Sequence, residues 1–247
     1  MLTVKGKHAV LEALEARQPI RYIVVSSQIT SRPDFKRLQS LSQQQGISVD
    51  VLRETDFQRR FPDSNSQGMV AVLKDVSFYP LDRVLKGDVS QRKIVVLDHL
   101  QDPHNVGAIL RTCECFGVDA VILPKDRQCP ITGAVAKVSS GAVYHVPLIQ
   151  VTNLGQALRQ LREAGYWIYG TDVETGDSLY DTPLHQPMVL IVGQEGKGQS
   201  KGLRKWVHSH VHIPLEGQIE SLNVSVATGV ILSHVQFSQN KLNGGEG

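Results

Sequence analysis

Wholly apolar runs recur along residues 92–238 and alternate with segments of helical periodicity. The runs predict strands at 94–97, 120–123, 143–149 (interrupted at Pro147), 167–169, 189–192 and 211–213. The periodic segments predict helices over 105–116, 154–164 and 223–237. Strands that are apolar throughout, separated by amphipathic helices, are typical of a parallel sheet covered on both faces. The predicted fold class for residues 92–238 is therefore an α/β domain built on a parallel sheet.

Residues 1–75 predict a second, smaller α/β unit. Its predicted strands are 22–25, 47–52 and 67–73, and its predicted helices are 8–15, 32–45 and 56–61. A unit of about 75 residues is large enough to fold alone, though only marginally. Residues 76–91 contain no long periodic stretch and are predicted to be a linker. Residues 239–247 are predicted to be a disordered tail.

Composition is that of an ordinary globular protein, with 41% hydrophobic and 20% charged residues. No apolar run approaches the ~20 residues of a membrane helix, and the N-terminus lacks the apolar core of a signal peptide. We therefore expect a cytoplasmic protein. Residues 1–75 hold 11 Lys and Arg against 8 Asp and Glu, a net charge of +3, and the remainder carries −1. This basic excess suits contacts with phosphate but is too small to indicate nucleic acid by itself.

The three cysteines, Cys113, Cys115 and Cys129, favour neither a disulfide framework nor a metal site. Their number is odd and no secretory signal accompanies them. Cys113 and Cys115 have the wrong spacing for a zinc knuckle, and no second Cys or His pair lies at metal spacing. We expect packed thiols and no metal.

Polar loops follow three of the predicted strands. Asp98–Arg111 follows the strand at 94–97, Gly193–Ser200 follows 189–192, and Pro214–Ser225 follows 211–213. Ligands of parallel α/β sheets bind beyond the carboxyl ends of the strands. The three loops together are therefore what a cofactor cleft on this architecture would show.

The glycines of the second loop match neither common nucleotide motif. Gly193-x4-Gly198 is followed by Gln199, where a phosphate loop has Lys. Counted from Gly196 and Gly198, the dinucleotide fingerprint would place its third glycine at Lys201. A nucleotide triphosphatase and a Rossmann-type oxidoreductase are both disfavoured.

Local reasoning leaves the polar residues of the three loops with two interpretations each. Asn105 stands where a helix N-cap belongs, and Ser221 and Asn223 precede a predicted helix, so capping alone explains all three. Without a function, Arg111 would be a surface charge and Glu195 a solvated turn residue.

In combination, however, the three segments resemble the motifs of the SpoU (TrmH-like) RNA 2′-O-methyltransferases of the SPOUT superfamily. The resemblance rests on Asp102-Pro-His-Asn-Val-Gly107, Gly193-x-Glu-Gly196, Ser221-Leu-Asn-Val-Ser225 and Ser139-Ser-Gly-Ala142, and covers nearly all of residues 92–238. Gly6-Lys-His-Ala-Val10 and Gln67-Gly68 resemble the ribosomal-protein-like, substrate-binding domain that many members carry. Gln194 and Lys5 replace residues that are commoner in the family.

The resemblance implies a deep C-terminal trefoil knot, a homodimer with the active site at its interface, and S-adenosylmethionine bound in the knot without a metal. Gly193, Ile213 and Leu222 would contact this cofactor largely through backbone, and Thr171 is a weaker candidate. The family's catalytic and RNA-facing residues correspond to Asn105, Arg111, Glu195, Ser221 and Asn223.

The two-domain layout is most similar to that of members that methylate a guanosine in the peptidyl-transferase loop of bacterial 23S rRNA. The same chemistry on tRNA, and an RNA-binding protein of this fold without catalysis, stay open as alternatives. Because arginine has a pKa above ~12, it is a poor base. We therefore hypothesise that Arg111 holds the target phosphate and that Glu195 orients Asn105 or Arg111. Ser221 and Asn223 would shape the cofactor and ribose pockets.

Overall fold

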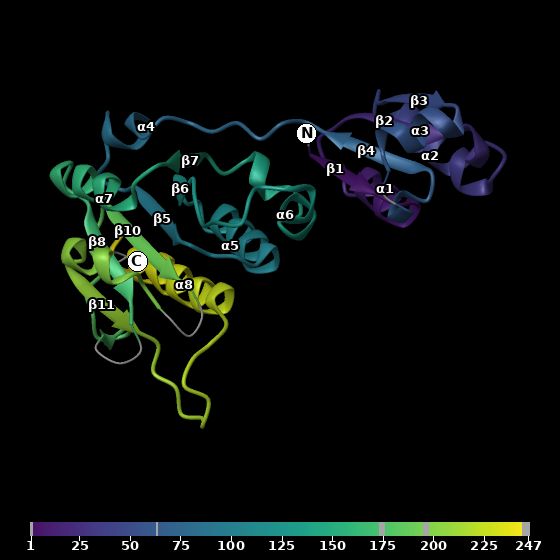
Figure 1. The fold of residues 1–247 in the computed structure, drawn as a ribbon. Coiled ribbons are helices and arrows are strands. Elements are labelled where there is room, and N and C mark those ends of the chain that lie inside the picture. The colour runs from purple at the N-terminus through teal and green to yellow at the C-terminus, as the bar shows by residue number, and fades with distance from the viewer. Residues whose placement is uncertain (1, 63, 173–175, 195–197, 244–247) are drawn as a thin grey trace. The chain divides into compact units, whose positions relative to one another are not determined.

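The computed structural model describes residues 2–62, 64–172, 176–194 and 198–243. The chain divides into two compact units (Figure 1). Unit 1 comprises Met1–Val76 with Ile131–Gly141, and unit 2 comprises Ser77–Pro130 with Ala142–Gly247. Within the described ranges, no helix is both long and apolar enough to cross a membrane.

Unit 1 is built on a four-stranded mixed sheet of order β1-β4-β2-β3. β2 pairs with β3 in parallel, and both other pairings are antiparallel. The sheet contains β1 (Thr3–Lys5), β2 (Ile20–Ser26), β3 (Ser48–Leu52) and β4 (Met69–Leu73), and the helices are α1 (Lys7–Glu15), α2 (Pro33–Gln44), α3 (Glu54–Arg60) and α6 (Gly133–Val138). Part of its core is formed by Phe57 and Phe61 of the α3 region, packed on Val24 and Val70 of the sheet.

Unit 2 is built on a seven-stranded sheet of order β7-β6-β5-β10-β8-β11-β9, in which every pairing is parallel. Its strands are β5 (Lys93–Asp98), β6 (Ala120–Pro124), β7 (Leu148–Val151), β8 (Trp167–Thr171), β9 (Asp177–Ser178), β10 (Met188–Gly193) and β11 (Ser209–His212). Its helices are α4 (Asp82–Leu85), α5 (Pro103–Cys115), α7 (Leu154–Glu163), α8 (Val224–Asn243) and the 3-10 segment η4 (Lys201–Trp206). The predicted parallel α/β sheet is confirmed.

Helices cover unit 2 on opposite faces of its sheet. Side chains at alternate strand positions, such as Ile94, Ile168 and Ile191, pack with Leu158 of α7 and Leu203 of η4 in one core cluster. The alternate positions point to the other face. α5 and α8 lie side by side, and α8 packs against β10 (Figure 1). In the central strands β5, β6 and β10, where nearly every residue is buried, ligands can reach the backbone only at the strand ends.

The domain boundaries from the sequence differ from these units in two places. Ser77 onward belongs to unit 2, where Val84 of α4 is buried and its carbonyl accepts a 2.6 Å hydrogen bond from the Tyr166 hydroxyl. Residues 131–141 group with unit 1, where the Lys137 ammonium lies 2.9 Å from the Glu12 carboxylate. Gly133 packs so closely there that a Cβ atom would lie 2.2 Å from the Thr3 carbonyl oxygen.

Several short elements also escaped prediction, among them β1, β9, α4, α6 and η4. β7 begins only at Leu148, after Pro147, instead of at residue 143. α8 continues to Asn243, so the tail predicted to be disordered from residue 239 is helical through that point. Gln, Lys and Leu, which occur in this stretch, are good helix formers.

Truncating the α7 core is expected to destabilise unit 2. Leu158 is fully buried in its core cluster, so Leu158→Ala should lower the free energy of unfolding by about 2–5 kcal/mol. Urea titration followed by tryptophan fluorescence reports on unit 2, because both tryptophans of the chain, Trp167 and Trp206, belong to it. The control, Leu215→Ala at a side chain that is 40% exposed, should change stability by less than about 0.5 kcal/mol. Equal effects would contradict this packing.

Candidate active site

The candidate site lies where β5, β10, β8 and β11 end. These four strands are neighbours in the parallel sheet, so their carboxyl ends lie along one edge. Segment 99–105 follows β5, segment 194–200 follows β10, and segment 213–223 follows β11 (Figure 1). The three polar loops of the sequence therefore leave the sheet at the same edge.

Asn105 lies inside the first turn of α5, and the prediction that it caps this helix is wrong. Asp102 is the N-cap, and its carboxylate accepts a 2.9 Å hydrogen bond from the His104 amide. Pro103 occupies the first helical turn, where its fixed φ and missing N–H are tolerated. The Asn105 side chain is thereby released from capping.

Asn105 and Asn223 are brought into direct contact. The Asn223 Nδ2 donates a 2.9 Å hydrogen bond to the Asn105 Oδ1, although the two residues lie 118 positions apart. Asn223 also caps α8, because its Oδ1 accepts bonds from the Ser225 amide at 2.9 Å and the Ser225 hydroxyl at 2.6 Å. The predicted capping role of Asn223 is confirmed, and the same side chain links α8 to α5.

The other predicted residues lie on α5, on the segment between β11 and α8, and at the end of β8. Arg111 is exposed on α5 and Ser221 is exposed before α8. Ile213 and Leu222 are half-buried on the segment between β11 and α8. Thr171 is half-buried at the end of β8, where its hydroxyl donates a long 3.5 Å bond to the Ile191 carbonyl. Glu195 lies outside the described residues.

Gly193 ends β10 in a position that admits no side chain. A Cβ atom there would lie 2.3 Å from the Gly198 carbonyl oxygen and 2.6 Å from the Gln199 amide nitrogen. Gln194 and Gly198 form a β-bridge, with a 2.8 Å hydrogen bond from the Gly198 amide to the Gln194 carbonyl. The loop therefore returns to pack its own backbone on Gly193.

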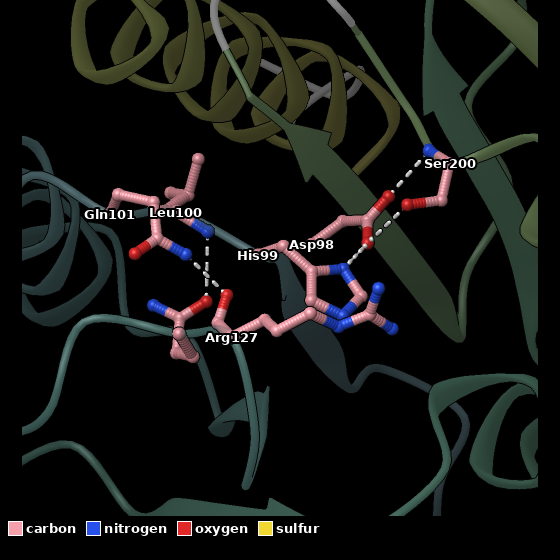
Figure 2. Close-up of polar contacts among 7 residues, drawn as sticks. Asp98, His99, Leu100, Gln101, Arg127 and Ser200 are labelled. Carbon is pink, nitrogen blue, oxygen red and sulfur yellow. Dashed lines mark hydrogen bonds and ion pairs between the residues drawn. The ribbon is translucent and has the colours of Figure 1, made fainter.

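Asp98, the last residue of β5, is a buried polar hub beside this loop (Figure 2). Its Oδ2 accepts a 2.6 Å bond from the Ser200 amide, and its Oδ1 accepts a 2.9 Å bond from the Ser200 hydroxyl. The His99 Nδ1 lies 2.6 Å from the same Oδ1. Asp98 thus joins the start of the first loop to the end of the second.

The backbone after Asp98 is fixed on its other side as well. His99 has a positive φ of 60°, a conformation that side-chain-bearing residues adopt only when their surroundings hold them there. Leu100 donates its amide to the Gln128 side chain at 2.9 Å, and the Gln101 side chain donates to the Arg127 carbonyl at 2.5 Å (Figure 2). These bonds hold the loop that leads into α5.

A second buried carboxylate contacts η4, the segment that follows residues 193–200, which we call the glycine loop. Asp172 follows β8, its side chain is only 7% exposed, and the Arg204 guanidinium lies 2.7 Å away. Sequence reasoning missed Asp98, Ser200, Asp172 and Arg204. An acidic residue directly after a wholly apolar strand is a usable signal, because buried carboxylates are rare unless they are paired.

Burial shifts several ionisable groups in this unit away from their charged forms. Burial raises the pKa of the Cys113 thiol. Burial also raises the pKa of the Cys129 thiol, and the negative charge of the nearby Asp102 carboxylate raises it further. Both thiols therefore stay protonated and unreactive at neutral pH. Burial lowers the pKa of His210 more than the neighbouring Asp172 raises it, so this imidazole is held towards its neutral form.

Comparisons with solved structures identify the class of fold. A Porphyromonas gingivalis structure described as an RNA methyltransferase of the TrmH family has a TM-score of 0.67 at 29% identity, covering 94% of this chain and 88% of that one. An AdoMet-bound rRNA methyltransferase from Sinorhizobium meliloti has a TM-score of 0.68 over 96% of this chain and 87% of that one. At 23% identity, this second likeness establishes the fold.

Sequence comparison gives the family. The model of the SpoU rRNA Methylase family matches residues 92–233, and the model for RNA 2′-O ribose methyltransferase substrate binding matches residues 3–79. A Staphylococcus saprophyticus relative, named for the TrmH family of tRNA/rRNA methyltransferases, is 32% identical over 97% of this chain and 96% of its own length. The chain belongs to the SpoU rRNA Methylase family, as its motifs predicted.

Replacing Gly193 should distort the glycine loop. Gly193→Ala places a Cβ atom within 2.3 Å of backbone, so the loop must shift and unit 2 should lose about 1–3 kcal/mol of stability. Gly202→Ala is the matched control, because a Cβ atom there meets nothing within 4 Å. Urea unfolding of both variants measures the difference. If the two variants proved equally stable, the close approach at Gly193 would be refuted.

Proposed function

We propose that this protein transfers a methyl group from S-adenosylmethionine to a ribose 2′-hydroxyl of RNA, and that its target is a guanosine in the peptidyl-transferase loop of 23S rRNA. The observation that carries the proposal is the hydrogen bond between Asn105 and Asn223, which joins two separate family motifs. Family membership supports methylation of RNA as the reaction.

The residues present fit S-adenosylmethionine. The backbone of Gly193 carries no side chain at the end of β10, and half-buried Ile213 and Leu222 supply apolar surface on the next loop. Together with Thr171 they would hold the adenosine and methionine parts largely through backbone and apolar contact. A cofactor is present in the S. meliloti structure of the same fold. When bound, this group supplies an electrophilic methyl carbon on a sulfonium, so the chemistry needs no metal.

The protein's own task is to orient and activate a weakly acidic hydroxyl. Alignment of the reacting atoms and help with proton removal both lower the barrier. Arg111 is exposed on α5, six residues beyond Asn105, and in our proposal its guanidinium holds the target phosphate. The Asn105–Asn223 pair, Ser221 and Glu195 would complete the ribose side of the site. Arginine stays charged at neutral pH, which suits an electrostatic role better than that of a base.

We also propose the knot and the homodimer that the family implies. The strand order supports the knot, because β10 lies between β5 and β8 although it follows both in sequence. Exposed apolar side chains on α8 support the dimer, since Val226 is 52% and Phe237 is 59% exposed. Such a surface is typical of an interface. It lies on the helix that packs beside α5, which carries Arg111.

The 23S rRNA target rests on the N-terminal domain. Residues 3–79 match the substrate-binding model, and residues 1–75 carry the basic excess of the chain. A domain of this kind supports a large structured RNA as substrate. Modification of tRNA is the second candidate, because the relatives' names include both RNAs.

A methylation map of cellular RNA tests the target. In cells that lack this protein, mass mapping of rRNA should show the loss of one 2′-O-methylguanosine in the peptidyl-transferase loop of 23S rRNA. Restoring the gene is the control and should restore the mark. An unchanged rRNA map with a changed tRNA would overturn the proposed target, and no change in either RNA would overturn the proposed activity.

The role of Arg111 is tested by Arg111→Lys. Lysine keeps the charge but loses the planar fork that grips phosphate, so kcat should fall by about one to two orders of magnitude. S-adenosylmethionine affinity should stay unchanged, since Arg111 is assigned to the RNA. Arg162→Lys, an exposed position on α7, is the matched control and should behave like the wild type. Near-normal turnover of Arg111→Lys would contradict a two-pronged phosphate contact.

A further inference from the structure

Asp98 is a buried carboxylate whose observed partners all come from the loops of the candidate site. Its side chain is 0% exposed, and its ion-pair partner within the described part of the chain is His99. A carboxylate removed from water is strongly disfavoured unless hydrogen bonds compensate it. Here Ser200 supplies two donors and His99 lies within bonding distance. The burial of Asp98 is therefore tied to the position of Ser200.

The glycine loop leaves the sheet beside Asp98 and returns to Asp98. In the pairing of β10 with β5, Gly193 stands directly opposite Asp98, at the last paired position. Ser200 follows seven residues later, and its amide and hydroxyl both bond the Asp98 carboxylate. Asp98 is therefore paired with Gly193 through the strand backbone and bonded to Ser200 through its side chain.

A displacement of Ser200 would reach Gly193 directly. The backbone of Gly198 and Gln199, immediately before Ser200, is the part of the loop that packs on Gly193. Glycine has little intrinsic conformational preference, so the backbone at Gly198, which has a positive φ of 60°, needs outside contacts to hold one conformation. The bonds from Ser200 to Asp98 are such contacts.

We propose that Asp98 is a positioning residue for the cofactor, and that the Asp98–Ser200 latch, meaning the two hydrogen bonds between these residues, holds the backbone of Gly198 and Gln199 in place against Gly193, where the cofactor would bind. The inference rests on the proposed binding of S-adenosylmethionine at Gly193. Asp98 acts through Ser200 and the loop. The cofactor itself contacts neither latch residue in this scheme.

A purely structural role for the latch makes a different prediction. If the latch only stabilised the fold, its loss would lower the melting temperature of the free protein and leave cofactor affinity unchanged. A positioning role raises the Kd and KM for S-adenosylmethionine. It leaves kcat at saturating cofactor, and the KM for RNA, close to wild type. The split between these constants separates the two roles.

Ser200→Ala is the first test, measured by calorimetric titration of S-adenosylmethionine into the full-length protein. It removes the hydroxyl bond but keeps the amide bond, so the protein should fold and the Kd should rise about fivefold, the value of one hydrogen bond. Asp98→Asn keeps the shape but removes the charge that serves both bonds, and should raise the Kd by about tenfold or more. Ser200→Thr retains a hydroxyl in an extended backbone and should restore wild-type binding.

The matched control is Thr182→Val. The Thr182 hydroxyl donates a 2.7 Å hydrogen bond to the Ser178 carbonyl within unit 2, and the valine variant loses this bond. The Kd of Thr182→Val for S-adenosylmethionine should equal that of the wild type. An unchanged Kd in Ser200→Ala, or an equal rise in Thr182→Val, would overturn the latch. Should Asp98→Asn fail to fold, Ser200→Ala and its threonine rescue still decide. If the wild type itself does not bind S-adenosylmethionine, the proposed function fails. If the wild type binds it and Ser200→Ala and Asp98→Asn bind it with the same Kd, only the latch proposal fails.

Discussion

The parallel pairing of β10 with β5 on one side and β8 on the other is the constraint on which the site depends. Every residue of β10 is buried, so this strand offers no polar side chain to solvent along its length. Gly193 and Asp98 occupy the last register position of the β10–β5 pair. The first groups able to meet a ligand are therefore those that follow this position. The polar residues assigned to the site come from the last position of a strand, as Thr171 does, from the loops that follow the strands, or from the helices that these loops begin.

Two buried carboxylates, Asp98 at the end of β5 and Asp172 directly after β8, hold the chain that follows the glycine loop. Apolar residues of similar volume often stabilise a fold as well as a buried ion pair does, so stability alone does not explain Asp98 and Asp172. Each carboxylate instead fixes the position of one specific partner. Asp98 accepts bonds from Ser200, and Asp172 pairs with Arg204 of the following η4 segment. The absence of a side chain at Gly193 permits the close approach of backbone. Asp98 then holds Ser200, just before η4, and Asp172 holds Arg204 within η4.

The sequence predicted the longer strands and helices of unit 2 because apolar runs and helical periodicity are local properties. Strand order is not local, and nothing in the pattern indicated that β10 inserts between β5 and β8. The hydrogen bond from Ser200 to Asp98 spans 102 positions and has no local signal at its serine end. The grouping of residues 131–141 with unit 1 depends likewise on a glycine, Gly133, whose partner lies near the start of the chain. Only the family resemblance predicted that Asn105 and Asn223 act together.

Asn223 shows that a capping role and a role in the site do not compete. Capping α8 requires one side-chain oxygen, and aspartate, serine or threonine would provide it as well as asparagine. In Asn223 the Oδ1 performs this task by accepting from Ser225, which fixes the carboxamide and directs its Nδ2 to Asn105. Aspartate at this position would cap the helix but could not donate to the Asn105 Oδ1, so the contact would survive only if the Asn105 carboxamide turned over to present its Nδ2. Capping alone therefore does not require an amide at this position, whereas donation to the Asn105 Oδ1 does.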